Sequence, residues 1–156
     1  MLKNTTRKRN LPQKKSCITV VASAYNAEYV DGMIAGALEA LANSGVENVE
    51  LIRVPGAFEI PVAVARLTRR KPKRPEAVLC LGVILRGKTK HADHIGHSVT
   101  QSLAQIAITS GIPVIHEVLL LETKAQAKAR CLSSKTNRGT EGAHTALEMA
   151  ALVCEL

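Results

Sequence analysis

The chain has 156 residues, of which 46% are hydrophobic, so it is long enough to fold as one domain with a sizeable buried core. No apolar run approaches the roughly 18–20 residues of a membrane span, and the scarcity of aromatic residues (2%, with no Trp) argues against modules that stack nucleic-acid bases on aromatic rings. The formal net charge of +8 arises from two blocks, residues 1–15 and 66–74, which together hold 12 of the 21 basic residues and no acidic one.

In chain order the apolar patterns predict strand 17–22, helix 27–42, strand 49–54, helix 58–70, strand 77–85, helix 91–110, strand 113–121, a short helix to about residue 131, and helix 140–154. The most apolar run, residues 77–85, predicts a central strand covered on both faces. Asn26 is the expected N-cap residue of the first helix, and Thr123 with Gln126 fits a capping box that opens the fourth.

This alternation predicts the α/β class, as a three-layer sandwich with helices on both faces of a flavodoxin-like parallel four-stranded sheet, in the order 2-1-3-4. We expect one domain over residues 16–156, preceded by a basic, disordered tail over residues 1–15. Ligands of such sheets bind beyond the carboxyl ends of the strands. The segments that follow the strands are therefore the first places to look for a site.

The four cysteines are widely spaced and form no CxxC pair, so the sequence supports neither a zinc ribbon nor a thioredoxin-type site. Residues 1–15 lack the apolar centre of a secretory signal, so we expect reduced thiols in a cytoplasmic protein. His91, His94 and His97 are spaced by three, but residues six apart differ by about 120° around a helix and do not converge. We therefore predict no metal site.

The two basic blocks admit two interpretations. The remaining residues include 9 basic and 13 acidic ones, a net charge of −4, so the basicity is localised. The blocks are either a solvated tail and a solvated helix end, or contact surfaces for polyanions, which such blocks attract electrostatically. Composition alone leaves both interpretations open.

Polar residues collect after three of the predicted strands. After residue 85, Gly87 permits close backbone approach, and the free amides of Lys88 and Thr89 at a helix N-terminus suit a phosphate, although an ordinary polar turn remains open. His91 beside such a site could transfer protons near neutral pH. Glu59 either complements a helix dipole or accepts hydrogen bonds from a polyol or amine. Tyr25 and Asn26 either offer a ligand an aromatic ring and an amide, or form a simple helix cap.

Several segments in the same order and spacing resemble the lumazine synthase family. Residues 54–61 read VPGAFEIP, and residues 81–91 read LGVILRGKTKH, similar to the family pattern LGxVIRGxTxH. Tyr25-Asn26 stands at the family's FN position. Further matches to the family's C-terminal pattern are Gln126-Ala127, Arg130, Asn137-Arg138-Gly139 and residues 146–150.

This resemblance, which runs from about residue 17 to residue 152, implies an enzyme of riboflavin biosynthesis. The family condenses 5-amino-6-(D-ribitylamino)uracil with 3,4-dihydroxy-2-butanone 4-phosphate to 6,7-dimethyl-8-ribityllumazine, releasing phosphate and water without a cofactor or a metal. By position, the resemblance implies that His91 is the proton-transfer residue. It assigns substrate contacts to Tyr25, Asn26, Ala57, Phe58, Glu59, Ile84, Leu85, His116 and Arg138, and phosphate contacts to Gly87, Lys88, Thr89 and Arg130.

The resemblance also implies self-association, since family members are pentamers or shells of twelve pentamers with sites between neighbours. His116, Arg130 and Arg138 would then reach the site of the adjacent chain. The chain departs from the family pattern at three of these positions, with Tyr25 for Phe, His116 for Phe and Arg138 for Lys. Two alternatives remain: a non-catalytic paralogue that binds riboflavin or a lumazine, and a nucleic-acid-binding protein acting through the basic blocks.

Overall fold

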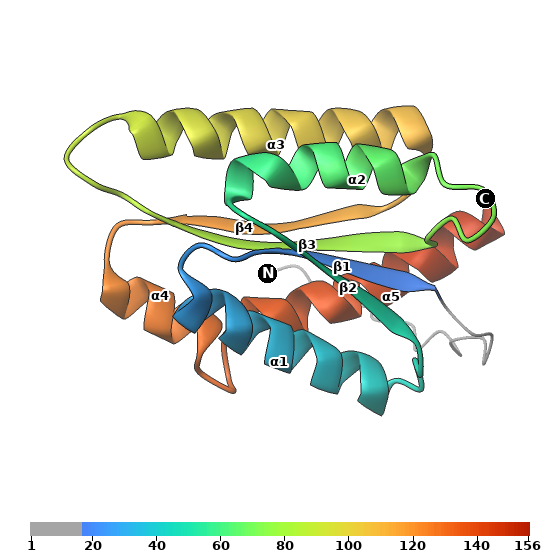
Figure 1. Ribbon diagram of the computed structural model, residues 1–156. Coiled ribbons are helices and arrows are strands. Elements are labelled where there is room, and N and C mark those ends of the chain that lie inside the picture. The colour runs from blue at the N-terminus through green and yellow to red at the C-terminus, as the bar shows by residue number, and fades with distance from the viewer. Residues whose placement is uncertain (1–16) are drawn as a thin grey trace, which may run out of the picture.

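The structure, a computed structural model, describes residues 17–156, which form three layers (Figure 1). The middle layer is an all-parallel sheet in the order β2-β1-β3-β4, which confirms the predicted α/β class and strand order. Its strands are β1 (Ile18–Ser23), β2 (Val49–Val54), β3 (Ala77–Leu85) and β4 (Val114–Leu121). The predicted tail over residues 1–15 lies outside the described residues.

Helices cover both faces of the sheet, and each face has its own apolar core. On one face pack α1 (Ala27–Asn43), α4 (Lys124–Cys131) and α5 (Arg138–Glu155), and on the other pack α2 (Ile60–Thr68) and α3 (His91–Ser110) (Figure 1). Strand β3 is buried along its length except at its last residue, which is half-buried, because successive side chains alternate between the two cores. The prediction of a central strand covered on both faces is thereby confirmed.

Two helices begin at residues other than those predicted. Residues 57–59 form a single 3₁₀ turn, so α2 begins at Ile60, with Pro61 in its first turn where no hydrogen bond to its nitrogen is needed. Helix α5 begins two residues early because the Asn137 side chain accepts hydrogen bonds from the backbone N–H of Gly139 (2.9 Å) and Thr140 (3.2 Å).

The capping box predicted at α4 forms with one change. Thr123 Oγ1 accepts from Gln126 N at 3.2 Å, as predicted. Gln126 Oε1, however, accepts from the backbone N–H of Glu122 (2.8 Å) and not from that of Thr123. None of the helices within residues 17–156 combines the length and the apolar character that crossing a membrane requires.

Candidate active site

The carboxyl ends of β1, β2 and β3 lie at the same end of the sheet, and the segments that follow them enclose a cavity of about 810 Å³. Ten of the fourteen residues singled out from the sequence line it. They are Tyr25, Asn26, Ala57, Phe58, Glu59, Ile84, Leu85, Gly87, Thr89 and His91. The parallel topology is what brings residues from three distant segments into one cavity.

The segment after β1 is held by hydrogen bonds to both neighbouring strands. Its backbone donates from Ala24 N to Val54 O (2.7 Å) and from Tyr25 N to Pro55 O (3.1 Å). The Asn26 side chain donates from Nδ2 to Val83 O at 2.7 Å. With its backbone fixed in this way, the Tyr25 side chain remains 72% exposed at the cavity, where a ligand can pack against the ring.

Asn26 differs from the capping residue expected from the sequence. It occupies the N-cap position of α1, but its backbone is left-handed (φ 55°, ψ 43°) and its side chain makes no capping hydrogen bond. Asparagine is one of the few residues that tolerate this conformation. Its side-chain amide donates to the backbone oxygen of Val83 in β3 and does not cap the helix. Asn26 therefore fastens the start of α1 to the end of β3.

Two substitutions separate these contributions of Asn26. Asn26→Gly removes the side-chain amide and keeps the left-handed conformation accessible, so we expect the free energy of unfolding to fall by about 1 kcal/mol, the contribution of the hydrogen bond. Asn26→Ala also carries the cost of the left-handed conformation, so we expect its free energy of unfolding to be lower than that of Asn26→Gly by roughly 1 kcal/mol. Urea denaturation of both variants measures the difference. Equal stabilities would show that the backbone conformation at residue 26 carries no such cost.

The 3₁₀ turn after β2 presents a carboxylate and an aromatic ring. Phe58 is 59% exposed at the cavity, and Glu59 is half-buried beside it. A Cβ atom on Gly56 would lie 2.8 Å from Glu59 Oε2, so glycine at this position leaves room for the carboxylate. The Glu59 side chain makes no hydrogen bond or ion pair with any other residue between 17 and 156, so both oxygens can accept from a ligand.

The loop between β3 and α3 is anchored at both ends by Arg86. Its backbone N–H donates to Leu121 O (2.9 Å), and its guanidinium pairs with Glu122 (3.2 Å) and with Asp93 in the first turn of α3. Among the described residues, the amides of Gly87, Lys88 and Thr89 have no hydrogen-bond acceptor. The loop thus offers free N–H groups beside a helix N-terminus, which is the arrangement that binds phosphate.

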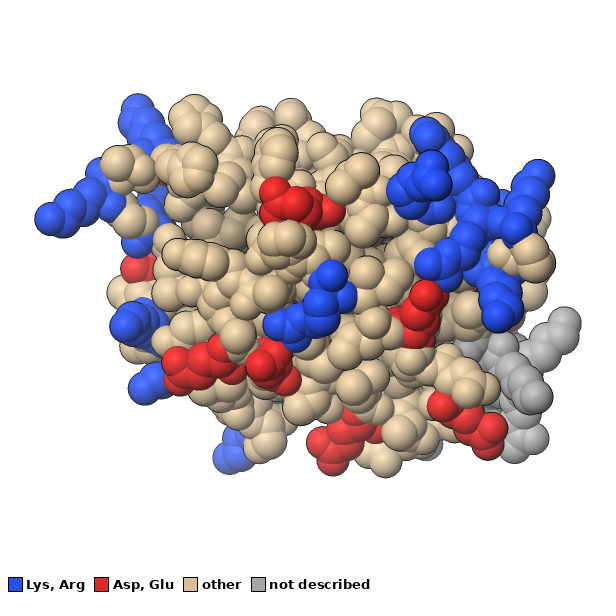
Figure 2. Space-filling model, viewed as in Figure 1, with Lys and Arg blue, Asp and Glu red and all other residues tan. Residues whose placement is uncertain are grey.

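Positive charge surrounds this loop. Figure 2 shows Lys and Arg side chains gathered at the end of the molecule where the β3–α3 loop lies, and Lys88 and Lys90 are exposed there. His91 is the first residue of α3, is exposed at the cavity, and its ring has no partner within the described part of the chain. An imidazole without a hydrogen-bond partner among the described residues therefore lies next to the free amides.

Lys88 is exposed on the loop but does not line the cavity, and neither do the three residues assigned to a neighbouring chain. On β4, His116 Nδ1 accepts from Val118 N (3.1 Å), so Nε2 of the neutral ring carries the hydrogen and donates to Thr100 Oγ1 (2.8 Å). Burial lowers the pKa of His116, which favours this neutral form. Arg138 pairs with the buried Glu117 at 3.0 Å, and Arg130 is exposed on α4.

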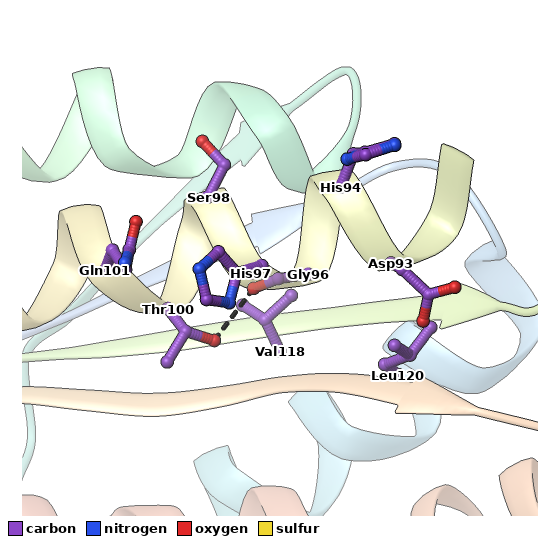
Figure 3. A pocket seen from close by; sticks show the side chains of 9 residues that line it. All are labelled: Asp93, His94, Gly96, His97, Ser98, Thr100, Gln101, Val118 and Leu120. Carbon is purple, nitrogen blue, oxygen red and sulfur yellow. Dashed lines mark hydrogen bonds between the residues drawn. The ribbon is translucent and has the colours of Figure 1, made fainter. Parts of the chain in front are cut away.

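A second cavity, of about 610 Å³, lies against α3 and β4 (Figure 3). Thr100, the residue bonded to His116, lines it and donates to Gly96 O at 2.8 Å, the bond dashed in the figure. His94 and Ser98 line both cavities. The two cavities therefore flank the same stretch of α3.

The sequence interpretation missed several lining residues of the first cavity. These are Gly56, Val83, Ala92, His94, Ile95 and Ser98. A signal for part of this set was present, since residues 91, 94, 95 and 98 follow the i, i+3, i+4, i+7 spacing of one helix face. Within residues 17–156, no group of three or more His, Cys, Asp or Glu side chains is arranged to hold a metal ion.

Comparison with known proteins assigns a family to this chain. A family model described as 6,7-dimethyl-8-ribityllumazine synthase matches residues 15–153. The protein of that name from Kineococcus radiotolerans is 45% identical over 133 residues, which cover 84% of this chain and 81% of the relative. Those from Halorhodospira halophila and Pyrococcus furiosus are 42% and 39% identical over 139 residues, covering 88% and 89% of this chain and 88% and 86% of the relatives.

The family match spans all the segments that build the cavity and continues into α5. Residues of the two longest motif segments, 54–61 and 81–91, lie together at the carboxyl end of the sheet. The chain belongs to the 6,7-dimethyl-8-ribityllumazine synthase family.

Proposed function

We propose that the chain condenses 5-amino-6-(D-ribitylamino)uracil with 3,4-dihydroxy-2-butanone 4-phosphate to 6,7-dimethyl-8-ribityllumazine, releasing phosphate and water. Membership of the family supports this reaction. The single observation that supports it most is the cavity, in which exposed rings, an unpaired carboxylate, a loop of free amides and a free imidazole lie together. These groups match an aromatic base, a polyol, a phosphate and a proton-transfer step respectively.

The pyrimidine and its ribityl chain occupy the side of the cavity formed by the ends of β1 and β2. Tyr25 packs against the pyrimidine ring, with Ile84 and Leu85 contacting it from the end of β3. Ala57 and Phe58 line the ribityl chain, and Glu59 accepts hydrogen bonds from its hydroxyls. Asn26 donates one amide hydrogen to Val83 O, which leaves its second amide hydrogen and Oδ1 for the substrate at the cavity.

The butanone phosphate lies at the β3–α3 loop. Gly87, Lys88 and Thr89 hold the phosphate through backbone N–H groups and the threonine hydroxyl. His91, two residues further on, transfers protons during Schiff-base formation, phosphate loss and ring closure. Holding the amine of one substrate against the carbonyl of the other supplies most of the rate, since the amine is already nucleophilic.

The catalytic unit is an assembly of chains, with pentamers as the form that family resemblance favours. His116, Arg130 and Arg138 lie outside this chain's own cavity, which agrees with a role at a neighbour's site. Arg130, exposed on α4, would complete the phosphate site there, and His116 and Arg138 would contact the pyrimidine. The four cysteines are free thiols, and we propose the reducing cytoplasm as the compartment.

Mixing the purified chain with the two substrates tests the proposed function. We expect the absorbance of the lumazine to appear together with one phosphate for each lumazine. A spectral shift on adding riboflavin or a lumazine, with no release of phosphate from the two substrates, would identify a binding paralogue and contradict the proposal.

Replacing Arg130 with lysine tests the phosphate assignment. Arginine offers phosphate a planar pair of N–H donors that lysine cannot reproduce, so we expect the KM for the butanone phosphate to rise about tenfold and the KM for the pyrimidine to change little. Lys128→Gln, which removes a charge from an exposed position of the same helix, is the matched control. An equal rise in both KM values would mean that Arg130 only supports α4.

A further inference from the structure

The histidines spaced by three along α3 are only partly used by the proposed function. His91 lines the first cavity, and His94, one turn further along the helix, lines it as well. His97 lines the second cavity and not the first. The fold therefore places two imidazoles at the candidate active site, although the reaction as proposed above uses only one of them.

The His94 side chain lies on the face of α3 that borders the first cavity. His91 and Ser98 line this cavity too, three residues before and four residues after His94, which is the spacing of one helix face. Figure 3 shows His94 and Ser98 on one side of α3, whereas Thr100 and Val118 of the second cavity lie on the other side. His94 thus faces a ligand of the first cavity.

The ring of His94 is available to such a ligand. The residue is exposed, and among residues 17–156 its ring has no hydrogen-bond partner and forms no ion pair. The adjacent carboxylate, Asp93, is already paired with Arg86. A neutral imidazole has one N–H donor and one acceptor nitrogen, so this ring can accept a proton and return one near neutral pH.

The position of His94 separates it from the phosphate-binding loop. Three residues of helix place it about 4.5 Å along the axis from His91, which directly follows that loop. The 3₁₀ turn of residues 57–59, which contacts the ribityl chain in the proposed function, packs against α3, with Ala57 and Ala92 in one buried cluster. His94 therefore lies one turn beyond the phosphate site, on the helix that borders the ribityl segment.

We propose that His94 is a second catalytic residue, which accepts the proton of the ribityl-bearing nitrogen during ring closure; this inference rests on the proposed function. In this step the nitrogen forms a C–N bond with the remaining carbonyl carbon of the four-carbon unit, and the π electrons of the C=O bond move to its oxygen. The N–H proton passes to His94, and the imidazolium returns a proton to that oxygen, which becomes a hydroxyl. His91 remains the proton-transfer residue beside the phosphate loop.

The test compares His94→Gln and His94→Ala with the unaltered chain in steady-state turnover of both substrates. Glutamine keeps a hydrogen-bond donor and an acceptor but does not exchange a proton near neutral pH, whereas alanine leaves room for added imidazole. His97→Ala is the matched control, because His97 is exposed on the same helix and does not line the first cavity. All three substitutions are at exposed positions, so we expect the fold and the assembly to persist, which circular dichroism and light scattering verify.

We expect both His94 variants to lose about tenfold or more in kcat, with the KM for the pyrimidine changed by less than about twofold, because a proton-transfer group acts in the transition state. Added imidazole should restore turnover of His94→Ala by about fivefold and should leave His94→Gln unchanged, since glutamine fills the place of the ring. The control should keep its turnover within about twofold and should not respond to imidazole.

Formation of the lumazine at the unaltered rate by both His94 variants would overturn this inference and leave the proposed function intact. Full turnover in His94→Gln alone, or a higher KM for the pyrimidine at unchanged kcat, would make His94 a binding group and overturn it as well. A loss that imidazole does not restore, or an equal loss in His97→Ala, would attribute the effect to the structure of α3. Absence of the lumazine with the unaltered chain would contradict the proposed function itself.

Discussion

His91→Ala is expected to lower turnover about 100-fold and leave the fold intact. General acid–base help contributes on the order of 100- to 10,000-fold, and the lower value applies because the amine substrate is already reactive and proximity supplies much of the rate. The side chain is exposed at the first residue of α3, so its removal opens no cavity in the core. Steady-state kinetics with each substrate varied in turn, together with a thermal melt, measures both effects.

His144→Ala is the matched control for this prediction. His144 is also exposed and helical, but it lies on α5 and does not line the cavity. We expect its turnover to equal that of the unaltered chain. Unchanged turnover in His91→Ala would remove this residue from the mechanism, and a similar loss in both variants would attribute the effect to something other than the imidazole at the cavity.

The layers of the fold follow from local patterns that the sequence displays directly. The run over residues 77–85 is apolar at every position, and it forms a strand whose side chains fill both cores along almost all its length. The helix over residues 91–110 has the predicted bounds because a polar loop precedes it and Gly111, in a left-handed conformation, follows it. Once strands and helices alternate, the right-handed crossover rule leaves few arrangements of the sheet.

Many residues that line the cavity could be predicted from the sequence because the strands are parallel. Parallel strands carry the segments that follow them to one end of the sheet, so Tyr25, Glu59 and His91 meet although they are far apart in the chain. Local patterns do not predict a hydrogen bond between a side chain and a distant strand. Asn26 precedes a helix and is a residue type typical of N-caps, but its side-chain amide donates to the backbone oxygen of Val83, 57 residues away.

Arg86 is a second example of a role set by distant residues. In the sequence it is one basic residue of a polar loop, whereas in the structure it joins the loop to Glu122 after β4 and to Asp93 in α3. His116 and Arg138, which the proposed function assigns to the site of a neighbouring chain, lie outside the cavity of their own chain. Their partners within the chain, Thr100 and Glu117, are long-range contacts as well.

Gly139→Ala is expected to be the most destabilising single substitution proposed for this chain. Gly139 lies at the start of α5 where that helix crosses α1, and an added Cβ atom would lie 1.9 Å from the backbone oxygen of Met33. The added Cβ atom is fixed by the backbone of α5 and would meet backbone atoms of Met33. Because no change of rotamer relieves this contact, the two helices must separate. We expect a loss of about 3 kcal/mol or more in the free energy of unfolding, the upper end for an overpacked core.

The surroundings of Gly139 prevent an easy adjustment of α5. Asn137, which precedes the helix, donates to Gly32 O (3.0 Å) and Cys131 O (2.7 Å) and accepts from Gly139 N (2.9 Å). Any shift that makes room for a methyl group at residue 139 therefore strains hydrogen bonds to α1 and to the end of α4. The same side chain that starts α5 two residues earlier than the sequence pattern indicated also fixes its distance from α1.

Gly96→Ala gives the matched comparison, since Gly96 is inside α3 and an added Cβ atom there would meet its nearest neighbour, Leu120, at 3.4 Å. Alanine has the higher helix propensity, so we expect this variant to be unchanged or up to about 1 kcal/mol more stable. Urea denaturation measures both variants, with the slope of the free energy against urea as a check that the unfolding transition is the same. If Gly139→Ala unfolds at the same urea concentration as Gly96→Ala, α1 and α5 are not in the close contact that this glycine permits.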